Sequence, residues 1–129
     1  LHYSAALDTP ANKAFAETYR TRYKKVPSYY SESMYTGGKW LIAAINAIDG
    51  RVEDRQSLID ALKRVKPDGL PRGPVTLDEY GNPVENVYIR RVDRVNGQLQ
   101  NTVIDTFPNV SQFWKYAPAD YLREPLYAR

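Results

Sequence analysis

The chain has 129 residues, the size of one domain, and no cysteine, which excludes disulfide bonds, thiol catalysis and thiolate metal sites. Its formal net charge of +3 is too small to indicate nucleic-acid binding, and its densest basic cluster, residues 20–25, falls at a predicted helix end, where cations complement the dipole. No apolar run approaches the roughly 20 residues of a membrane span, and a single histidine cannot build a histidine-based metal site. We therefore expect a soluble protein without metal or cofactor.

The first predicted helix follows a short segment, residues 1–7, whose weak alternation is typical of the end of a strand. The helix starts at Thr9, a polar cap, with Pro10 in the first turn where its missing N–H costs nothing, and it ends before Pro27. Aromatic side chains recur every four residues and predict one stripe along its buried side: Phe15, Tyr19 and Tyr23.

A second helix is predicted to begin after Tyr30, to run to Ile48 and to be stopped by Gly50. Its expected apolar face follows a spacing of three and four residues: Met34, Gly38, Leu41, Ile45 and Ile48. Gly37 and Gly38 each cost about 1 kcal/mol in helix propensity relative to alanine. We therefore expect another backbone to approach this helix closely.

A third helix is predicted to start at Asp54, whose carboxylate can cap it, and to be broken by residues 66–69. Its core side is expected to be apolar: Leu58, Ile59, Leu62 and Val65. Three helices are thus complete before any extended sheet begins.

The second half of the chain predicts strands. A short strand at 75–77 precedes a turn at 79–83, and the segment 87–95 is predicted to pair with 99–107 across an Asn-Gly turn. Because the first half holds no complete sheet, these strands are expected to need partners that this chain lacks. The tail, 111–129, is rich in aromatic residues and is expected to wrap a surface as irregular chain or short helix.

Features of catalysis are scarce, whereas those of binding are frequent. No glycine-rich nucleotide loop or nucleophile motif is present, and the carboxylates beside turns or helix starts are of the capping type: Asp8, Asp78 and Glu79. The chain is therefore not expected to be an enzyme. Eleven tyrosines offer flat faces with a hydroxyl group at the edge. Tyr29 and Tyr30 precede a helix whose first N–H groups, near residues 31–34, would suit a carboxylate, and ligand contact and plain packing both remain open for them.

Five segments, in this order, carry a family resemblance: residues 8–15 (DTPANKAF), 27–30 (PSYY), 35–38 (YTGG), 73–79 (GPVTLDE) and 110–114 (VSQFW). Together they resemble the C-terminal third of the solute-binding proteins of ABC transporters, in the family of receptors for branched-chain amino acids with the type I periplasmic binding fold. The resemblance covers nearly the whole chain.

The resemblance implies an α/β fold with two lobes joined by three crossing segments, which close on a ligand by hinge motion. Residues 1–86 would be part of the first, N-terminal lobe. Residues 87–92 would be the third hinge crossing, and the rest of 87–129 would form the C-terminal hairpin of the second lobe and the aromatic tail. The chain, which starts at Leu1, would then be a C-terminal fragment whose missing part supplies the central parallel strands.

The function implied is that of the extracytoplasmic, periplasmic component of an ABC importer. Its partners would be a small-molecule ligand, an ABC permease in the membrane and the remaining N-terminal part of the same protein, with no nucleic acid and no cofactor. The tail is more similar to the subgroup that takes aromatic acids, so an aromatic carboxylate is the preferred ligand. A branched-chain or other amino acid is second.

Carried over by position, the resemblance places Tyr30 in the first-lobe wall of the cleft, with Tyr29, Glu32 and Met34 as neighbours and Tyr3 at the end of the incoming strand. Two alternatives remain open. The same fold serves as the ligand-sensing domain of receptors and regulators without a transport role. A free-standing interaction module would instead show a cooperative melt of residues 1–129 alone.

Overall fold

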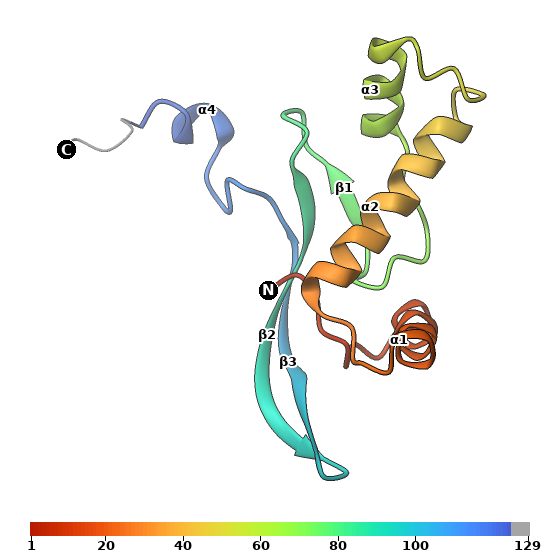
Figure 1. Ribbon diagram of the computed structural model, residues 1–129. Helices are drawn as coiled ribbons and strands as arrows, with labels where there is room; N and C mark the ends of the chain where they lie inside the picture. Colours follow the sequence, from red (N-terminus) through yellow and green to blue (C-terminus); the bar gives the residue numbers. More distant parts are fainter. Residues whose placement is uncertain (125–129) are drawn as a thin grey trace, which may run out of the picture.

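The computed structural model describes residues 1–124 and contains both helices and an antiparallel sheet (Figure 1). Three helices lie on one side of the sheet, and a short fourth helix lies beyond its other side. The elements are, in chain order, α1 (Pro10–Tyr23), α2 (Tyr29–Asn46), α3 (Arg55–Arg64), β1 (Val75–Leu77), β2 (Pro83–Val95), β3 (Gln98–Val110) and α4 (Pro118–Tyr121).

Helix α1 starts where predicted and ends three residues before Val26, earlier than the predicted end at Val26 and Pro27. The side chain of Thr9 accepts a hydrogen bond from the backbone N–H of Asn12, and Pro10 occupies the first turn. The helix ends at Tyr23, and the capping residue Lys24 adopts a left-handed conformation with φ 56°. Phe15 is buried as predicted, but Tyr23 is half exposed, so the aromatic stripe is buried only in part.

Helix α2 starts earlier than predicted, at Tyr29. Ser28 caps it: the Ser28 side chain accepts from the N–H of Ser31, and the Ser31 hydroxyl accepts from the N–H of Ser28 at 2.8 Å. This capping box has serine where glutamate or glutamine is usual, which is why the sequence pattern did not reveal it. Tyr29 and Tyr30 therefore lie in the first helical turn and not in a loop.

The predicted apolar face of α2 is wrong except at Ile48, which is buried as predicted. Met34 is 77% exposed and Leu41 is also exposed. The buried positions lie on a neighbouring face and recur every four residues: Glu32, Thr36, Trp40, Ala44 and Ile48. Two polar contacts explain this orientation, because Trp40 donates from Nε1 to the carbonyl of Leu62 at 2.8 Å and Glu32 is bound by an arginine.

The helix ends at Asn46, two residues before the predicted Ile48, and the chain turns at Gly50, where φ is 76°. The close backbone approach expected at Gly37 and Gly38 is not found among the described residues. No heavy atom lies within 4 Å of a Cβ built at either position.

Helix α3 begins as predicted, with Asp54 Oδ1 accepting from the N–H groups of Gln56 and Ser57. Ala61 is its buried residue, and the partly buried Leu58, Leu62 and Val65 pack with Ala61 against α2. Ile59 was expected on this side but is exposed.

The sheet has the strand order β1-β2-β3, and both pairings are antiparallel. The predicted hairpin is confirmed: Val87 pairs with Phe107 and Val95 with Gln98. Asn96 and Gly97 have φ of 49° and 80°, as expected of the two-residue turn that matches strand twist. The short strand at 75–77 is also confirmed.

The N-terminal residues pair with the middle of β2. Leu1 and Tyr88 exchange two backbone hydrogen bonds, of 2.8 and 3.2 Å, but none of residues 1–7 forms a strand, so the strand end expected there is not found. Ser4 then closes a turn with the N–H of Leu7.

Within residues 1–124, buried apolar side chains form three small core clusters. The first contains Tyr3, Leu7, Phe15 and Tyr88. The second contains Trp40, Leu70 and Val75, and the third contains Ala44, Ile48 and Ala61. Large apolar side chains remain exposed on α2 and on both strands of the hairpin, among them Leu41, Val92, Leu99 and Ile104. The expectation that the strands need further partners is consistent with this exposure.

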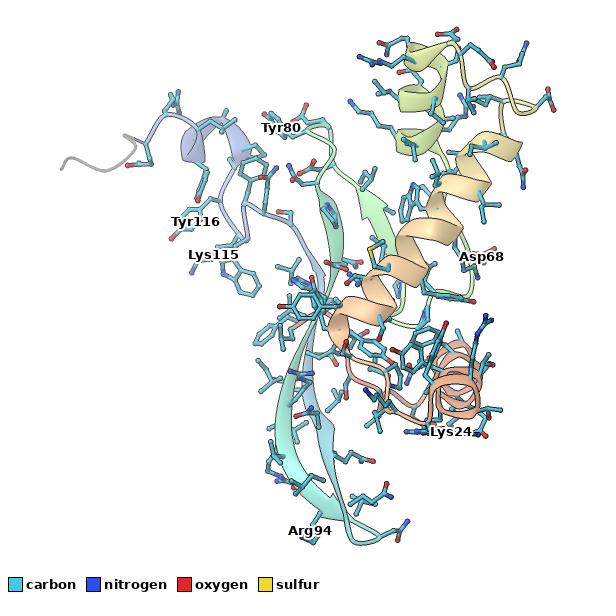
Figure 2. All side chains as sticks on the ribbon, viewed as in Figure 1. Lys24, Asp68, Tyr80, Arg94, Lys115 and Tyr116 are labelled. Carbon is cyan, nitrogen blue, oxygen red and sulfur yellow. The ribbon has the colours of Figure 1, made fainter. Side chains whose placement is uncertain are left out.

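The described part of the C-terminal tail, residues 111–124, contains the expected short helix, α4, and its Lys115 and Tyr116 lie well away from α1 and α2 (Figure 2). Phe113 is buried against Tyr80 and Tyr121, whereas Trp114 and Tyr116 are exposed. Tyr127, part of the predicted tail, lies outside the described residues. Within residues 1–124 no helix has the length and apolar character needed to cross a membrane.

Candidate functional site

A buried charged junction joins four parts of the chain at Arg72, which follows α3. Arg72 donates from Nε to Glu32 Oε2 at 2.8 Å and from Nη1 to Glu85 Oε2 at 2.7 Å. Its Nη2 contacts both Glu32 Oε2 and the Ser33 hydroxyl at 2.5 Å. The remaining oxygen of Glu32 accepts from the Thr36 hydroxyl at 2.5 Å. The junction thus ties α2 to β2 through charged side chains that are at most 8% exposed.

The junction also reaches the N-terminal segment and Tyr29. His2 Nδ1 lies 3.1 Å from Glu85 Oε1, and the guanidinium carbon of Arg72 lies 5.5 Å from the centre of the Tyr29 ring. Tyr88 donates its hydroxyl to the carbonyl of Arg72 at 2.6 Å. Burial alone would lower the pKa of Arg72, but its hydrogen bonds to Glu32 and Glu85 outweigh burial and raise that pKa above its ordinary value. Arg72 is therefore a permanent cation.

Beside the junction is an open cavity of about 760 Å³. Three segments that are distant in sequence line it: the N-terminal residues, the connection from α1 into α2, and the hairpin near its turn. Three of the five predicted site residues are among its lining residues: Tyr3, Tyr29 and Tyr30. Glu32 and Met34 are not.

The two adjacent tyrosines differ in exposure. Tyr30 is 79% exposed, while Tyr29 is partly buried between His2 and Arg72. Their rings meet edge to face with centroids 5.6 Å apart. Met34 lies one turn after Tyr30 on the same exposed side of α2. Tyr30 thus offers an exposed aromatic face next to the ring of Tyr29, which His2 and Arg72 hold in place.

Tyr3 is only 1% exposed, and its hydroxyl has no hydrogen-bond partner among the described residues. Burial raises the pKa of Tyr3, and the negative charge of Glu32 raises it further. Tyr3 is neutral at physiological pH and belongs to both the core and the cavity wall.

Two arginines line the cavity and were not among the predicted site residues: Arg20 from α1 and Arg90 from β2. Arg90 donates from Nη1 to the carbonyl of Tyr3 at 2.9 Å. None of the described residues that line the cavity is an aspartate or glutamate. The sequence does indicate that Arg90 shares a strand face with Tyr88, because residues two apart in a strand point to the same side. It does not indicate which face of the strand borders a cavity.

The anion site expected at the start of α2 is not free in the structure. The N–H of Ser31 donates to the Ser28 side chain, and the N–H of Glu32 donates to the Ser28 carbonyl. The cap formed by Ser28 thus already uses these donors, and the arginines remain the groups suited to an anion. In residues 1–124, no three His, Cys, Asp or Glu side chains are grouped as a metal site would require.

The model of the periplasmic binding protein family matches residues 1–98. Among solved structures, an ABC transporter substrate-binding protein from Sphaerobacter thermophilus is 34% identical, with a TM-score of 0.78 over 83% of this chain and 29% of that one. A solute-binding protein of an ABC transporter from Rhodopseudomonas palustris BisB5, in complex with 3,4-dihydroxybenzoic acid, is 33% identical, with a TM-score of 0.80 over 85% and 30%. One from R. palustris in complex with benzoate is 30% identical, with a TM-score of 0.76 over 86% and 30%.

The chain therefore spans about 30% of the length of these structures. No curated protein matches it. The matched structures are those of substrate-binding and solute-binding proteins, in agreement with the expectation that the chain is not an enzyme. On the strength of the match over residues 1–98, the chain belongs to the periplasmic binding protein family and has part of its type I fold.

Proposed function

We propose that the protein is the extracytoplasmic solute-binding component of an ABC importer and captures a small organic acid. The observation that carries this proposal is the cavity beside α2, which brings together Tyr3, Tyr29 and Tyr30 in a chain that is 33% identical to a protein in complex with 3,4-dihydroxybenzoic acid. Aromatic side chains with a few polar groups are typical of small-molecule sites.

An aromatic carboxylate is the preferred ligand, with an amino acid second. The exposed face of Tyr30 and the held ring of Tyr29 suit a flat apolar body. Two arginines and the lack of aspartate and glutamate among the described lining residues favour an anion over a zwitterion, whose ammonium group would lie near like charges. The leucine-binding protein from Thermotoga maritima, at 23% identity, supports the fold alone and carries no ligand argument.

The capture mechanism we propose is closure of two lobes. In this arrangement residues 1–86 belong to the first lobe, residues 87–92 form the third crossing, and the rest of 87–129 reaches into the second lobe. The exposure of the hairpin supports it, since Val92, Leu99 and Ile104 are each more than half exposed and Arg94 lies near the turn at the far end of the hairpin (Figure 2). The remaining part of the same protein would supply that cover, and tighter binding to the closed form would drive closure.

Within this proposal the five predicted residues have different roles. Tyr30 and Tyr29 contact the ligand, Met34 borders it, and Tyr3 closes the cavity wall. Glu32 acts through Arg72, because its carboxylate is fully buried and both of its oxygens are already bound. The junction would keep Tyr29 in the orientation that the ligand meets.

Isothermal titration of the full-length protein with benzoate, 4-hydroxybenzoate, 3,4-dihydroxybenzoate and leucine tests the ligand class. We expect binding of at least one aromatic acid, and a loss of about tenfold or more for Tyr30→Ala, which removes a stacking face. Tyr116→Ala is the matched control, because Tyr116 is also exposed but lies outside the cavity. Absence of heat with every compound would reject the assignment.

The transport role needs a separate measurement. Uptake of the bound acid by cells with and without the gene should differ if the protein feeds a membrane permease. Binding without any change in uptake would favour the alternative of a ligand-sensing receptor or regulator.

A further inference from the structure

We propose that Arg90 is the residue that pairs with the carboxylate of the ligand. The inference rests on the proposed function and adds to it the residue that selects an acid over a neutral compound of the same shape. Arg90 lies on β2, the strand that also carries Glu85 and Tyr88 of the junction.

The charge of the cavity wall is the first argument. Arg20 and Arg90 are its charged side chains, and neither aspartate nor glutamate occurs among the lining residues that the structure describes. An isolated cluster of like charge in a hollow surface concentrates the field and attracts the opposite charge. A small anion is the ligand that this wall fits.

The second argument is that Arg90 is held in place while most of its donors stay available. One guanidinium nitrogen, Nη1, donates to the carbonyl of Tyr3, which also lines the cavity. Guanidinium has five N–H donors in a planar fork that matches a carboxylate, and no carboxylate pairs with Arg90 among residues 1–124. The neighbouring Arg91, by contrast, is already paired with Asp93.

The third argument concerns the hairpin and the burial of Arg90. Ile89 pairs with Asp105 but Arg90 pairs with Val103, so Ile104 of β3 is an extra residue opposite this point of β2. Such bulges are frequent next to binding sites. Arg90 is partly buried, whereas Arg20 is exposed on the surface of α1. Arg90 is therefore the better-fixed of the two cations.

The test compares an acid with its neutral counterpart, 4-hydroxybenzoate with 4-hydroxybenzamide, by isothermal titration of the full-length protein. We expect Arg90→Gln to lower the affinity for the acid by about 30-fold or more, as the removal of one partner of a buried charge pair does. The affinity for the amide should change by less than about threefold. Arg90→Lys keeps the charge without the fork and should retain part of the preference for the acid. Arg91→Gln, on the adjacent exposed residue, is the matched control and should leave both affinities unchanged.

The outcomes separate this inference from the proposed function. Wild-type protein that binds the acid, together with an Arg90→Gln variant that binds it equally well, would overturn the role of Arg90 alone. An equal loss of acid and amide would also overturn it, since that result indicates a general distortion of the cavity. If Arg90→Gln does not fold, the inference is decided by Arg90→Lys, and a preference for the acid that stays the same as in the wild-type protein would contradict it. Wild-type protein that binds no aromatic acid would reject both proposals.

Discussion

Replacing Arg72 with methionine keeps much of the side-chain volume but removes the cation that holds Glu32 and Glu85. The side chains of Arg72, Glu32 and Glu85 are 8%, 0% and 7% exposed, so water cannot take the place of the lost contacts. Removing one partner of a buried ion pair costs about 3–5 kcal/mol, because the other charge is left unpaired. Here two carboxylates are left, and the contact with the Tyr29 ring is also lost.

We therefore expect Arg72→Met to lower the free energy of unfolding by about 4 kcal/mol or more. Chemical denaturation of the full-length protein measures this change, provided that the slope of the transition is the same in both proteins. Arg91→Met is the control, since the pair of Arg91 with Asp93 is exposed and should contribute little. A loss in Arg72→Met no greater than in this control would refute the view that the junction is desolvated and electrostatically essential.

Two further predictions concern buried polar groups. Burial raises the pKa of Tyr3 and Tyr88 above the ordinary tyrosine value of 10.0, so the stability that their neutral forms contribute is fully present below pH 10 and is lost as the pH rises further. Absorbance titration at alkaline pH should show two tyrosines that ionise only as the protein unfolds. Ionisation of every tyrosine near pH 10 in the folded protein would contradict this prediction. Trp40→Phe leaves the carbonyl of Leu62 without its donor and should lower the free energy of unfolding, measured by chemical denaturation, by about 1–3 kcal/mol. Trp114→Phe on the exposed tail should lower it by less than about 0.5 kcal/mol, and equal effects would show that the Trp40 hydrogen bond contributes nothing.

The elements whose signals are local were predictable from the sequence. Thr9 and Asp54 cap their helices with their own side chains, and the Asn-Gly turn sets the hairpin register within a few residues. The face that α2 buries was not predictable, because Glu32 becomes a core residue only when Arg72, forty positions later, neutralises it. A pattern of apolar residues assigns such a glutamate to the surface.

The residues of the candidate site likewise fall into those that the sequence could predict and those that it could not. Tyr29 and Tyr30 could be singled out because they stand beside a helix start, and both line the cavity. Arg20 and Arg90 could not, since only the fold brings α1 and β2 to one hollow. Charge alone does not distinguish a cation that faces a cavity from one that faces bulk water.

The division of the core into three small clusters has a consequence for how the molecule opens. Helix α3 is held to α2 by Ala61 and its neighbours, and none of its residues belongs to the Arg72 junction. Amide protons of α3 should therefore exchange with solvent through local fluctuations that leave the Arg72 junction closed. The Tyr88 hydroxyl is bound to the carbonyl of Arg72, so the amides around Tyr88 should exchange only when the junction itself opens and should be the slowest to exchange among residues 1–124.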